Sequence, residues 1–386
     1  MSLRIIISFF SVALLFSSTC IGQSAGEKTF EFLNMVTSAR IASLGGNAIS
    51  LKDNDLELAY QNPSLLNKEM DNHFVLNYSD YFADINLGSF YYAKTYDKLG
   101  SFAAGIQYMH YGTFKETDEI GNVLRDFVAE DIVVSIGWGI PITPKFSLPN
   151  GQKVVIDSLF HIGSNLKLIY SSYHFDYQAI GVAMDLSSTY WNPKNNLTIA
   201  LVLKNIGLQL KSYTKENKEN IPLDLQLGIS KKLKHAPFRL MLNLQHLENW
   251  DLTYTSNSEN TTVLNDAVQD TTLLDKIGKN ILGFGDKFMR HATIGSEIII
   301  TNNFNIRLGY NYRRRKELGV STKKGLNGFS FGVGIKVSKL HLSYGRAAYH
   351  LAGAPNYITL RTNFSEFSKK ASDLSNRIQK VREPTF

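Results

Sequence analysis

The feature that most constrains this chain is a repeated alternation of apolar and polar residues, in segments of about ten residues bounded by turn-forming residues. From Phe329 to Ser338, phenylalanine, valine and isoleucine alternate with serine, glycine and lysine. Phe304–Arg313 and Leu223–Ser230 alternate in the same way. Successive side chains of a β-strand point to opposite faces, so each segment predicts a strand with one apolar and one polar face. We therefore expect an all-β protein.

Fourteen such segments fit between residues 71 and 364. A soluble β-sandwich would also alternate. Three features favour a membrane instead: the apolar faces are continuous, tyrosine and tryptophan gather at segment ends, and the opposite faces are rich in glycine, serine and charge. The prediction is a transmembrane outer-membrane β-barrel of 14 antiparallel strands. Its segments are Asn72–Tyr81, Ile85–Thr95, Ser101–Thr113, Phe127–Ile140, Leu159–His174, Tyr177–Trp191, Leu197–Ile206, Pro222–Leu233, Pro237–Asn249, His291–Ile300, Asn303–Arg313, Asn327–Val337, Leu340–Tyr349 and Asn356–Phe364.

An even strand number predicts that both termini lie on the periplasmic side, where barrel turns are short. The long connections Lys115–Asp126, Gly207–Ile221, Trp250–Arg290 and Arg314–Leu326 then all face outward, and Pro141–Ser158 is the exception. The surface loop at residues 250–290 contains an amphipathic stretch, Leu273–Leu282, which we interpret as a lid or docking element. We expect residues 365–386 to form a polar periplasmic tail.

The first 22 residues have the pattern of a secretory signal peptide. Arg4 precedes an apolar run from Ile5 to Phe16, and small residues lie at Cys20 and Gly22. Cleavage after Gly22 would remove the sole cysteine. The alternative is a lipidated Cys20, which Ser18 and Thr19 disfavour.

Residues 23–70 differ from the rest of the chain because they do not alternate. They are rich in small residues, and the Gly45-Gly46 pair permits tight turns. The Asn62-Pro63 step predicts that any helix before it ends at or before Asn62. We predict that this segment is a compact plug inside the barrel lumen.

The plug motif, Phe30 to Leu66 with Thr-Ser-Ala-Arg-Ile-Ala-Ser-Leu-Gly-Gly at its centre and Ala-Tyr-Gln-Asn-Pro-Ser-Leu-Leu at its end, resembles the PorQ-type proteins of the type IX secretion system. With the related PorV type, these are similar to the FadL family of plugged fourteen-stranded barrels. The resemblance implies an outer-membrane protein of a Bacteroidetes-type bacterium that serves secretion and attachment of cargo.

The sequence predicts no enzyme and no bound cofactor. The net charge of +7 is spread along the chain, which disfavours nucleic-acid binding. The histidines are scattered without metal-ligand spacing. Ser212…Lys215 and Ser321…Lys324 match a Ser-x-x-Lys pattern without its partner motifs. Gly332-Val333-Gly334 lies within a predicted strand, where inward glycines beside a plug explain it better than a nucleotide loop.

Three charged groups have candidate roles. Asp53-Asn54-Asp55 is interpreted as a turn rather than a calcium site. Arg40, on the plug, needs a carboxylate partner in the lumen, with Asp185 and Asp224 as candidates. A basic run lies at the predicted outer rim and consists of Arg313, Arg314, Arg315 and Lys316. One interpretation is that it binds lipopolysaccharide phosphates or an acidic partner, and the other is that it is a solvated loop.

Two functions remain open at this point. The first is a non-enzymatic component of the type IX secretion system, whose outer loops hold a surface partner. The second is a FadL-like transporter of long-chain fatty acids or other hydrophobic compounds. The polar inward faces, with Arg307, Asn311 and Gln226 among them, favour the first.

Overall fold

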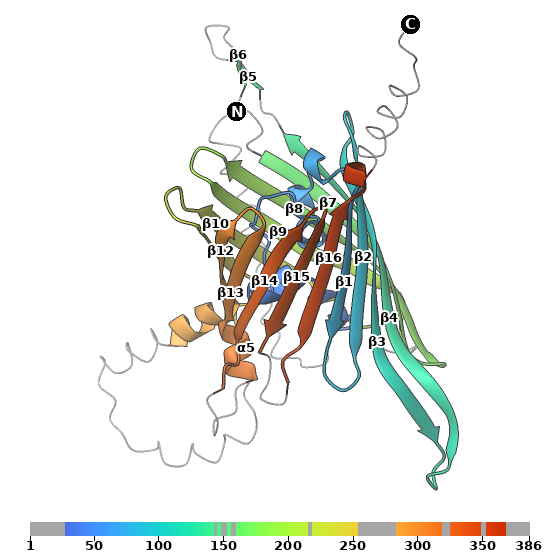
Figure 1. Ribbon diagram of the computed structural model, residues 1–386. Helices are drawn as coiled ribbons and strands as arrows, with labels where there is room; N and C mark the ends of the chain where they lie inside the picture. Colours follow the sequence, from blue (N-terminus) through green and yellow to red (C-terminus); the bar gives the residue numbers. More distant parts are fainter. Residues whose placement is uncertain are drawn as a thin grey trace, which may run out of the picture.

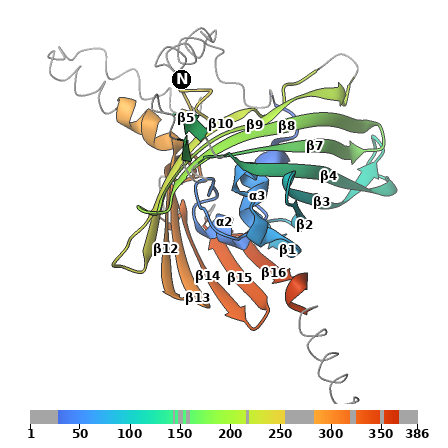
Figure 2. The same ribbon diagram turned by 90° about the horizontal axis from the view of Figure 1, so that it is seen from above.

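The computed structural model is a closed antiparallel barrel of fourteen strands around a short helical segment (Figures 1 and 2). It describes residues 28–142, 145–147, 153–155, 160–214, 218–253, 283–318, 325–348 and 353–367. The barrel strands are β1 (His73–Asp80), β2 (Asn86–Tyr96), β3 (Gly100–Thr117), β4 (Val123–Ile142), β7 (Phe160–His174), β8 (Tyr177–Asn192), β9 (Leu197–Lys211), β10 (Asp224–Lys232), β11 (Phe238–Leu244), β12 (Ala292–Thr301), β13 (Phe304–Asn311), β14 (Phe329–Val337), β15 (Leu340–Ala347) and β16 (Asn356–Asn363).

Each barrel strand pairs with its neighbours in sequence, and β1 closes the ring by pairing with β16. In this register, apolar residues of neighbouring strands lie opposite one another on the outer face of the barrel. Leu76 faces Leu360 on one side and Phe90 on the other. Leu76 is 47% exposed, whereas Asn77, its neighbour in sequence, is 2% exposed. An outward surface this apolar is stable in lipid and costly in water, so the predicted outer-membrane barrel is confirmed as the fold.

The two ends of the barrel differ. We call the end with the connections 97–99, 143–159, 193–196, 233–237, 302–303 and 338–339 the turn end. The other, the loop end, has the longer connections 212–223, 245–291, 312–328 and 348–355. The exception expected at Pro141–Ser158 lies at the turn end, where a two-stranded sheet of β5 (Lys145–Ser147) and β6 (Lys153–Val155) occupies part of the connection. The predicted strand count is nevertheless correct.

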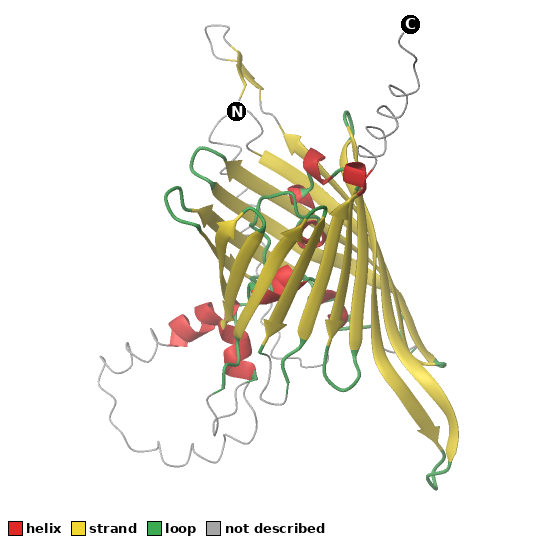
Figure 3. Cartoon of the chain, viewed as in Figure 1, coloured by secondary structure: helices red, strands yellow, loops and turns green. Residues whose placement is uncertain are grey.

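The segment before β1 lies inside the ring, as Figures 2 and 3 show. Its short helices are η1 (Glu31–Asn34), α2 (Ala39–Ser43), α3 (Glu57–Gln61), η2 (Pro63–Leu65) and η3 (Lys68–Met70). Lys28 pairs with Asn220 at the loop end, and Asn72 pairs with Ala93 near the start of β1 at the turn end. The described part of the plug therefore crosses the whole lumen. Its first described residues lie at the opposite end from Asn363. The expectation that both termini share one side stays a prediction, because residues 1–27 and 368–386 lie outside the described part of the chain.

The plug packs against the wall through apolar side chains. One cluster joins Leu44, Leu51 and Leu58 of the plug to Met241 and Tyr357 of the wall. A second cluster joins Phe30, Phe32 and Leu33 to wall residues nearer the loop end, including Ile169 and Ala179. The wall must approach closely here, and a Cβ atom on Gly309 would lie 2.2 Å from the Gly45 nitrogen. Such glycines let the barrel close tightly on the plug.

Three predicted boundaries are wrong. The connection Lys115–Asp126 is mostly strand, because β3 and β4 continue as a hairpin that projects beyond its neighbours at the loop end (Figure 1). β9 likewise continues to Lys211, past the predicted end at Ile206. Tyr312 and Arg313 belong to a helix, α5 (Tyr312–Glu317), which begins there because the Asn311 side chain accepts a hydrogen bond from the Arg314 backbone. Leu273–Leu282 lies outside the described residues, and residues 283–291 are helical.

Candidate functional site

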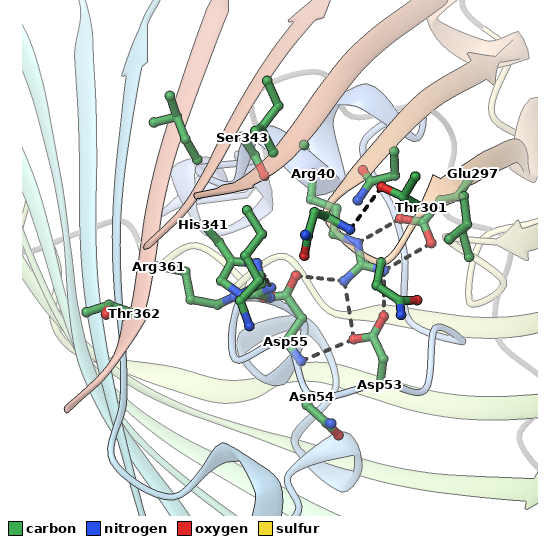
Figure 4. Close-up of a pocket in the computed structure, with 18 of the residues that line it drawn as sticks. Arg40, Asp53, Asn54, Asp55, Glu297, Thr301, His341, Ser343, Arg361 and Thr362 are labelled. Atoms are coloured by element: carbon green, nitrogen blue, oxygen red, sulfur yellow. Dashed lines mark hydrogen bonds and ion pairs between the residues drawn. The ribbon is translucent and has the colours of Figure 1, made fainter. Parts of the chain in front are cut away.

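The centre of the candidate site is Arg40, which lies on the plug helix α2 and is 6% exposed. Ser38 caps this helix by accepting a hydrogen bond from the Ile41 backbone. The guanidinium group makes three ion pairs: Nη2 lies 2.6 Å from Asp53 Oδ2, Nη1 lies 2.6 Å from Asp55 Oδ2, and Nε lies 2.8 Å from Glu297 Oε1 (Figure 4). The first two partners belong to the plug and the third to β12.

Three wall arginines complete this cluster. Arg239 on β11 binds both Asp53 and Glu297, with N–O distances of 2.9 Å. Arg307 on β13 lies 3.3 Å from Glu297, and Arg361 on β16 lies 2.5 Å from Asp55. We call Arg40, Arg239, Arg307, Arg361 and their carboxylate partners the arginine cluster. Its ion pairs join the plug directly to β11, β12 and β16, and Arg307 on β13 is linked to the plug through Glu297. Buried charges are tolerated only when they are paired in this way.

The plug carboxylates show the electrostatic effect of this pairing. Burial alone would raise their pKa values. The guanidinium groups of Arg40 and Arg239 nevertheless hold the pKa of Asp53 well below its usual range. Arg361 and Arg40 do the same for the pKa of Asp55. Both stay ionised, and the cations they pair with are guanidinium groups of the chain itself.

Glu57, at the start of α3, behaves differently. It is 3% exposed, and its carboxylate accepts a hydrogen bond from the Ser38 hydroxyl. Burial and the neighbouring Asp55 carboxylate raise the pKa of Glu57 to about 7. The plug therefore contains a group that changes its charge near neutral pH.

The arginine cluster borders a cavity of about 500 Å³ at the turn end. Its other lining residues are also mostly polar, with Lys336, Lys339, His341, Glu69 and Glu366 among them. A long apolar molecule would find few apolar contacts on this wall.

Two neutral contacts fix the rest of the plug motif. Asn62 donates to the carbonyl of Ile49 at 2.6 Å and to Thr189 on β8 at 3.0 Å. Pro63 lies against the wall, where a Cβ atom on Gly163 would be 2.3 Å from its carbonyl carbon. Gly45 and Gly46 have φ angles of +93° and +95°, and the Gly45 nitrogen donates to Ser330 on β14. These residues hold the plug in place, and the tight turn expected at the glycine pair is present.

Arg40 has carboxylate partners, as predicted, but the two predicted residues, Asp185 and Asp224, are wrong. Asp185 lies 2.7 Å from Lys167, and both side chains are completely buried. Asp224 instead accepts hydrogen bonds from Gln226 and from the His246 backbone. Arg239, Glu297 and Arg361 were missed, although each occupies an inward position of an alternating strand, a signal that could have found them.

A second cavity, of about 310 Å³, lies at the loop end. Its lining combines polar groups with Met35, Val36, Tyr81 and Leu318. The structure therefore places differently composed cavities at the two ends of the lumen.

The basic run is divided by α5. Arg313 and Arg314 line the loop-end cavity, and Arg313 lies 3.6 Å from Glu317. Arg315 donates to the Gly325 carbonyl at 2.6 Å, and Lys316 lies 3.5 Å from Asp286. The four side chains thus do not form one uniform surface, and their contact with lipid stays a prediction.

Fold and plug together define a class: an outer-membrane β-barrel whose lumen is occupied by its own N-terminal segment. Within the described residues, no helix is long and apolar enough to span a bilayer.

No protein-family model matches the chain, and no curated protein matches it. Among solved structures, it is similar to the Pseudomonas putida toluene transporter TodX, with a TM-score of 0.43 and 13% identity over 84% of this chain and 96% of that one. A Pseudomonas aeruginosa FadL homologue gives a TM-score of 0.43 and 10% identity, over 85% and 98% of the two chains. A KdgM porin gives 0.31 and 7%, over 75% and 98%. Similarities this low say nothing about what this chain binds.

Proposed function

We propose that the protein is a non-conducting, plugged barrel of the outer membrane that holds a partner at the cell surface, as part of the type IX secretion system. The observation that supports a plugged, non-conducting barrel is the arginine cluster, which joins the plug to three wall strands by buried and half-buried ion pairs. The link to secretion is supported by the resemblance of the motif between Phe30 and Leu66 to PorQ-type proteins.

The projecting hairpin of β3 and β4 is the part of the described loop end best suited to hold a partner. It exposes apolar side chains near its tip, where Ile120 is 85% exposed, and Val123 and Leu124 are also exposed. A two-stranded projection offers both apolar side chains and backbone groups to a partner. We assign the docking role to this hairpin, with the loop end facing the cell exterior.

A second candidate function is passage of small hydrophobic compounds. It is favoured by the partly apolar lining of the loop-end cavity, with Met35, Val36, Tyr81 and Leu318. The charged lining of the turn-end cavity argues against this function. A hydrophobic molecule that bound at the loop end would have to pass this charged lining to leave the barrel at the other end.

A pull-down from gently solubilised outer membranes tests the docking role. A tag after Phe386 would recover the wild type and a variant with Ile120→Ser, Val123→Ser and Leu124→Ser. We expect a stoichiometric surface protein with the wild type and its loss with the variant. Leu99→Ser, at a turn-end position that is 62% exposed, is the matched control and should retain the partner.

The same preparations separate the two functions. Planar bilayers containing the wild type should show no stable conductance, and cells should take up labelled fatty acid or toluene no faster than a strain lacking the protein. Recovery of the barrel alone, together with faster uptake in the presence of the protein, would establish transport and reject docking.

A further inference from the structure

Three side chains of metal-binding type meet at the loop end, apart from the arginine cluster. Asp224 is the first residue of β10, and His246 and Glu248 follow the end of β11 at Leu244. The backbone continues the pairing of these strands, because the Leu247 nitrogen donates to the Leu225 carbonyl at 3.0 Å. One ligand atom from each of the three residues lies within 4.8 Å of the other two.

The two distances from the His246 imidazole match the separation of ligands around one ion. His246 Nδ1 lies 3.4 Å from Glu248 Oε1 and 3.6 Å from Asp224 Oδ1. Both separations exceed the usual range for hydrogen bonds between nitrogen and oxygen. Two ligands at about 2.1 Å from a tetrahedral Zn²⁺ ion are separated by about 3.4 Å. The geometry therefore fits a shared metal better than two hydrogen bonds.

The carboxylates are already oriented by hydrogen bonds. Asp224 Oδ1 accepts one from the His246 backbone at 2.7 Å and keeps a second lone pair for a metal. Gln226 donates to Asp224 Oδ2 at 2.5 Å, and the Leu225 backbone donates to Glu248 Oε2 at 2.9 Å. Glu248 Oε1 is buried and has no hydrogen-bond partner. A buried carboxylate oxygen without a hydrogen bond is costly, and a metal ion would offset that cost.

We propose that Asp224, His246 and Glu248 bind one divalent transition-metal ion of the Zn²⁺ class. One imidazole nitrogen and two carboxylates form a donor set that suits zinc, whereas calcium takes six to eight oxygens. The loop-end cavity, which Asp224 and His246 line, gives space for water in a fourth position. Lys204, the cross-strand partner of Asp224, offsets part of the negative charge.

The ion would have a mechanical role. It would join the start of β10 to the first residues of the connection 245–291 and so fix the base of that connection to the barrel rim. This inference does not depend on the docking role, because it concerns a different part of the loop end.

Metal titration of the purified full chain tests the site. The protein, in detergent and without a polyhistidine tag, would be stripped with a chelator and titrated with Zn²⁺ and with Co²⁺. We expect about one ion per chain by elemental analysis, and visible Co²⁺ absorption bands typical of tetrahedral coordination. His246→Ala and Glu248→Gln should each weaken binding at least about tenfold.

His235→Ala, at an exposed turn-end histidine, is the matched control and should bind like the wild type. Heat-modifiable migration in electrophoresis shows whether each variant is folded, and Glu248→Gln nearly preserves side-chain shape. A folded wild type that binds no more Zn²⁺ than folded His246→Ala or Glu248→Gln would overturn the proposal.

Discussion

The two ends of the lumen hold the plug by different means. At the turn end, four arginines and their carboxylate partners are buried or half-buried, and their ion pairs join the plug to the strands β11, β12 and β16. At the loop end, the plug meets the wall through Phe30, Phe32 and Leu33 and borders a cavity of mixed lining. Ion pairs demand specific geometry, whereas apolar contacts tolerate rearrangement. The comparison implies that the turn end fixes the plug and that any rearrangement begins at the loop end.

Removing Arg40 should have the largest effect. Arg40→Ala leaves Asp53, Asp55 and Glu297 with fewer cations in a buried site, and breaking a buried pair costs about 3–5 kcal/mol. Hydrogen exchange should show loss of protection in residues 39–51. Arg313→Ala, at the partly exposed loop-end pair with Glu317, should change protection by less than about 1 kcal/mol. Equal effects of the two substitutions would contradict the comparison.

A wall glycine offers a second way to disturb the plug. In Gly309→Ala, the added Cβ atom would lie 2.2 Å from the Gly45 nitrogen, so the plug must move, at a cost of about 1–3 kcal/mol. Gly88→Ala is the control, since its nearest neighbour would be a backbone oxygen at 3.7 Å. Protease resistance of the plug should fall only for Gly309→Ala.

Glu57 makes the plug sensitive to pH. Its pKa of about 7 lies above the value of an unfolded glutamate, so the folded chain retains a proton that the unfolded chain has lost. This contribution to stability therefore falls as pH rises from about 4.5 to about 7, by up to about 3 kcal/mol. Hydrogen exchange of the plug at pH 5 and pH 8 should show the change, and Glu57→Gln should remove it. An unchanged pH dependence in Glu57→Gln would reject this assignment.

The basic run should give the smallest effect. Replacing Arg313, Arg314, Arg315 and Lys316 with serine removes charge at the loop end, and we expect weaker lipopolysaccharide retention with little loss of stability, because these pairs are partly exposed. Lipid analysis of purified samples measures this. Retention equal to that of the wild type would end the hypothesis of lipid contact.

The fold could be predicted almost completely, because alternation with a period of two is a local signal that does not depend on distant residues. The same signal shows which residues face the lumen. It does not show their height or position around the ring, and so could not match Arg40 with Glu297, 257 residues away in sequence. The extension of β3 and β4 was missed because their outer parts are exposed on both faces and carry no alternation of burial.

The path of the plug also constrains how the molecule is assembled. Residues 28–70 run from one rim to the other before the first strand begins, and the seam joins His73 to Asn363. The strand that follows the plug, β1, is also the strand that closes the ring by pairing with β16. One continuous stretch of chain therefore first fills the lumen and then seals the wall around it.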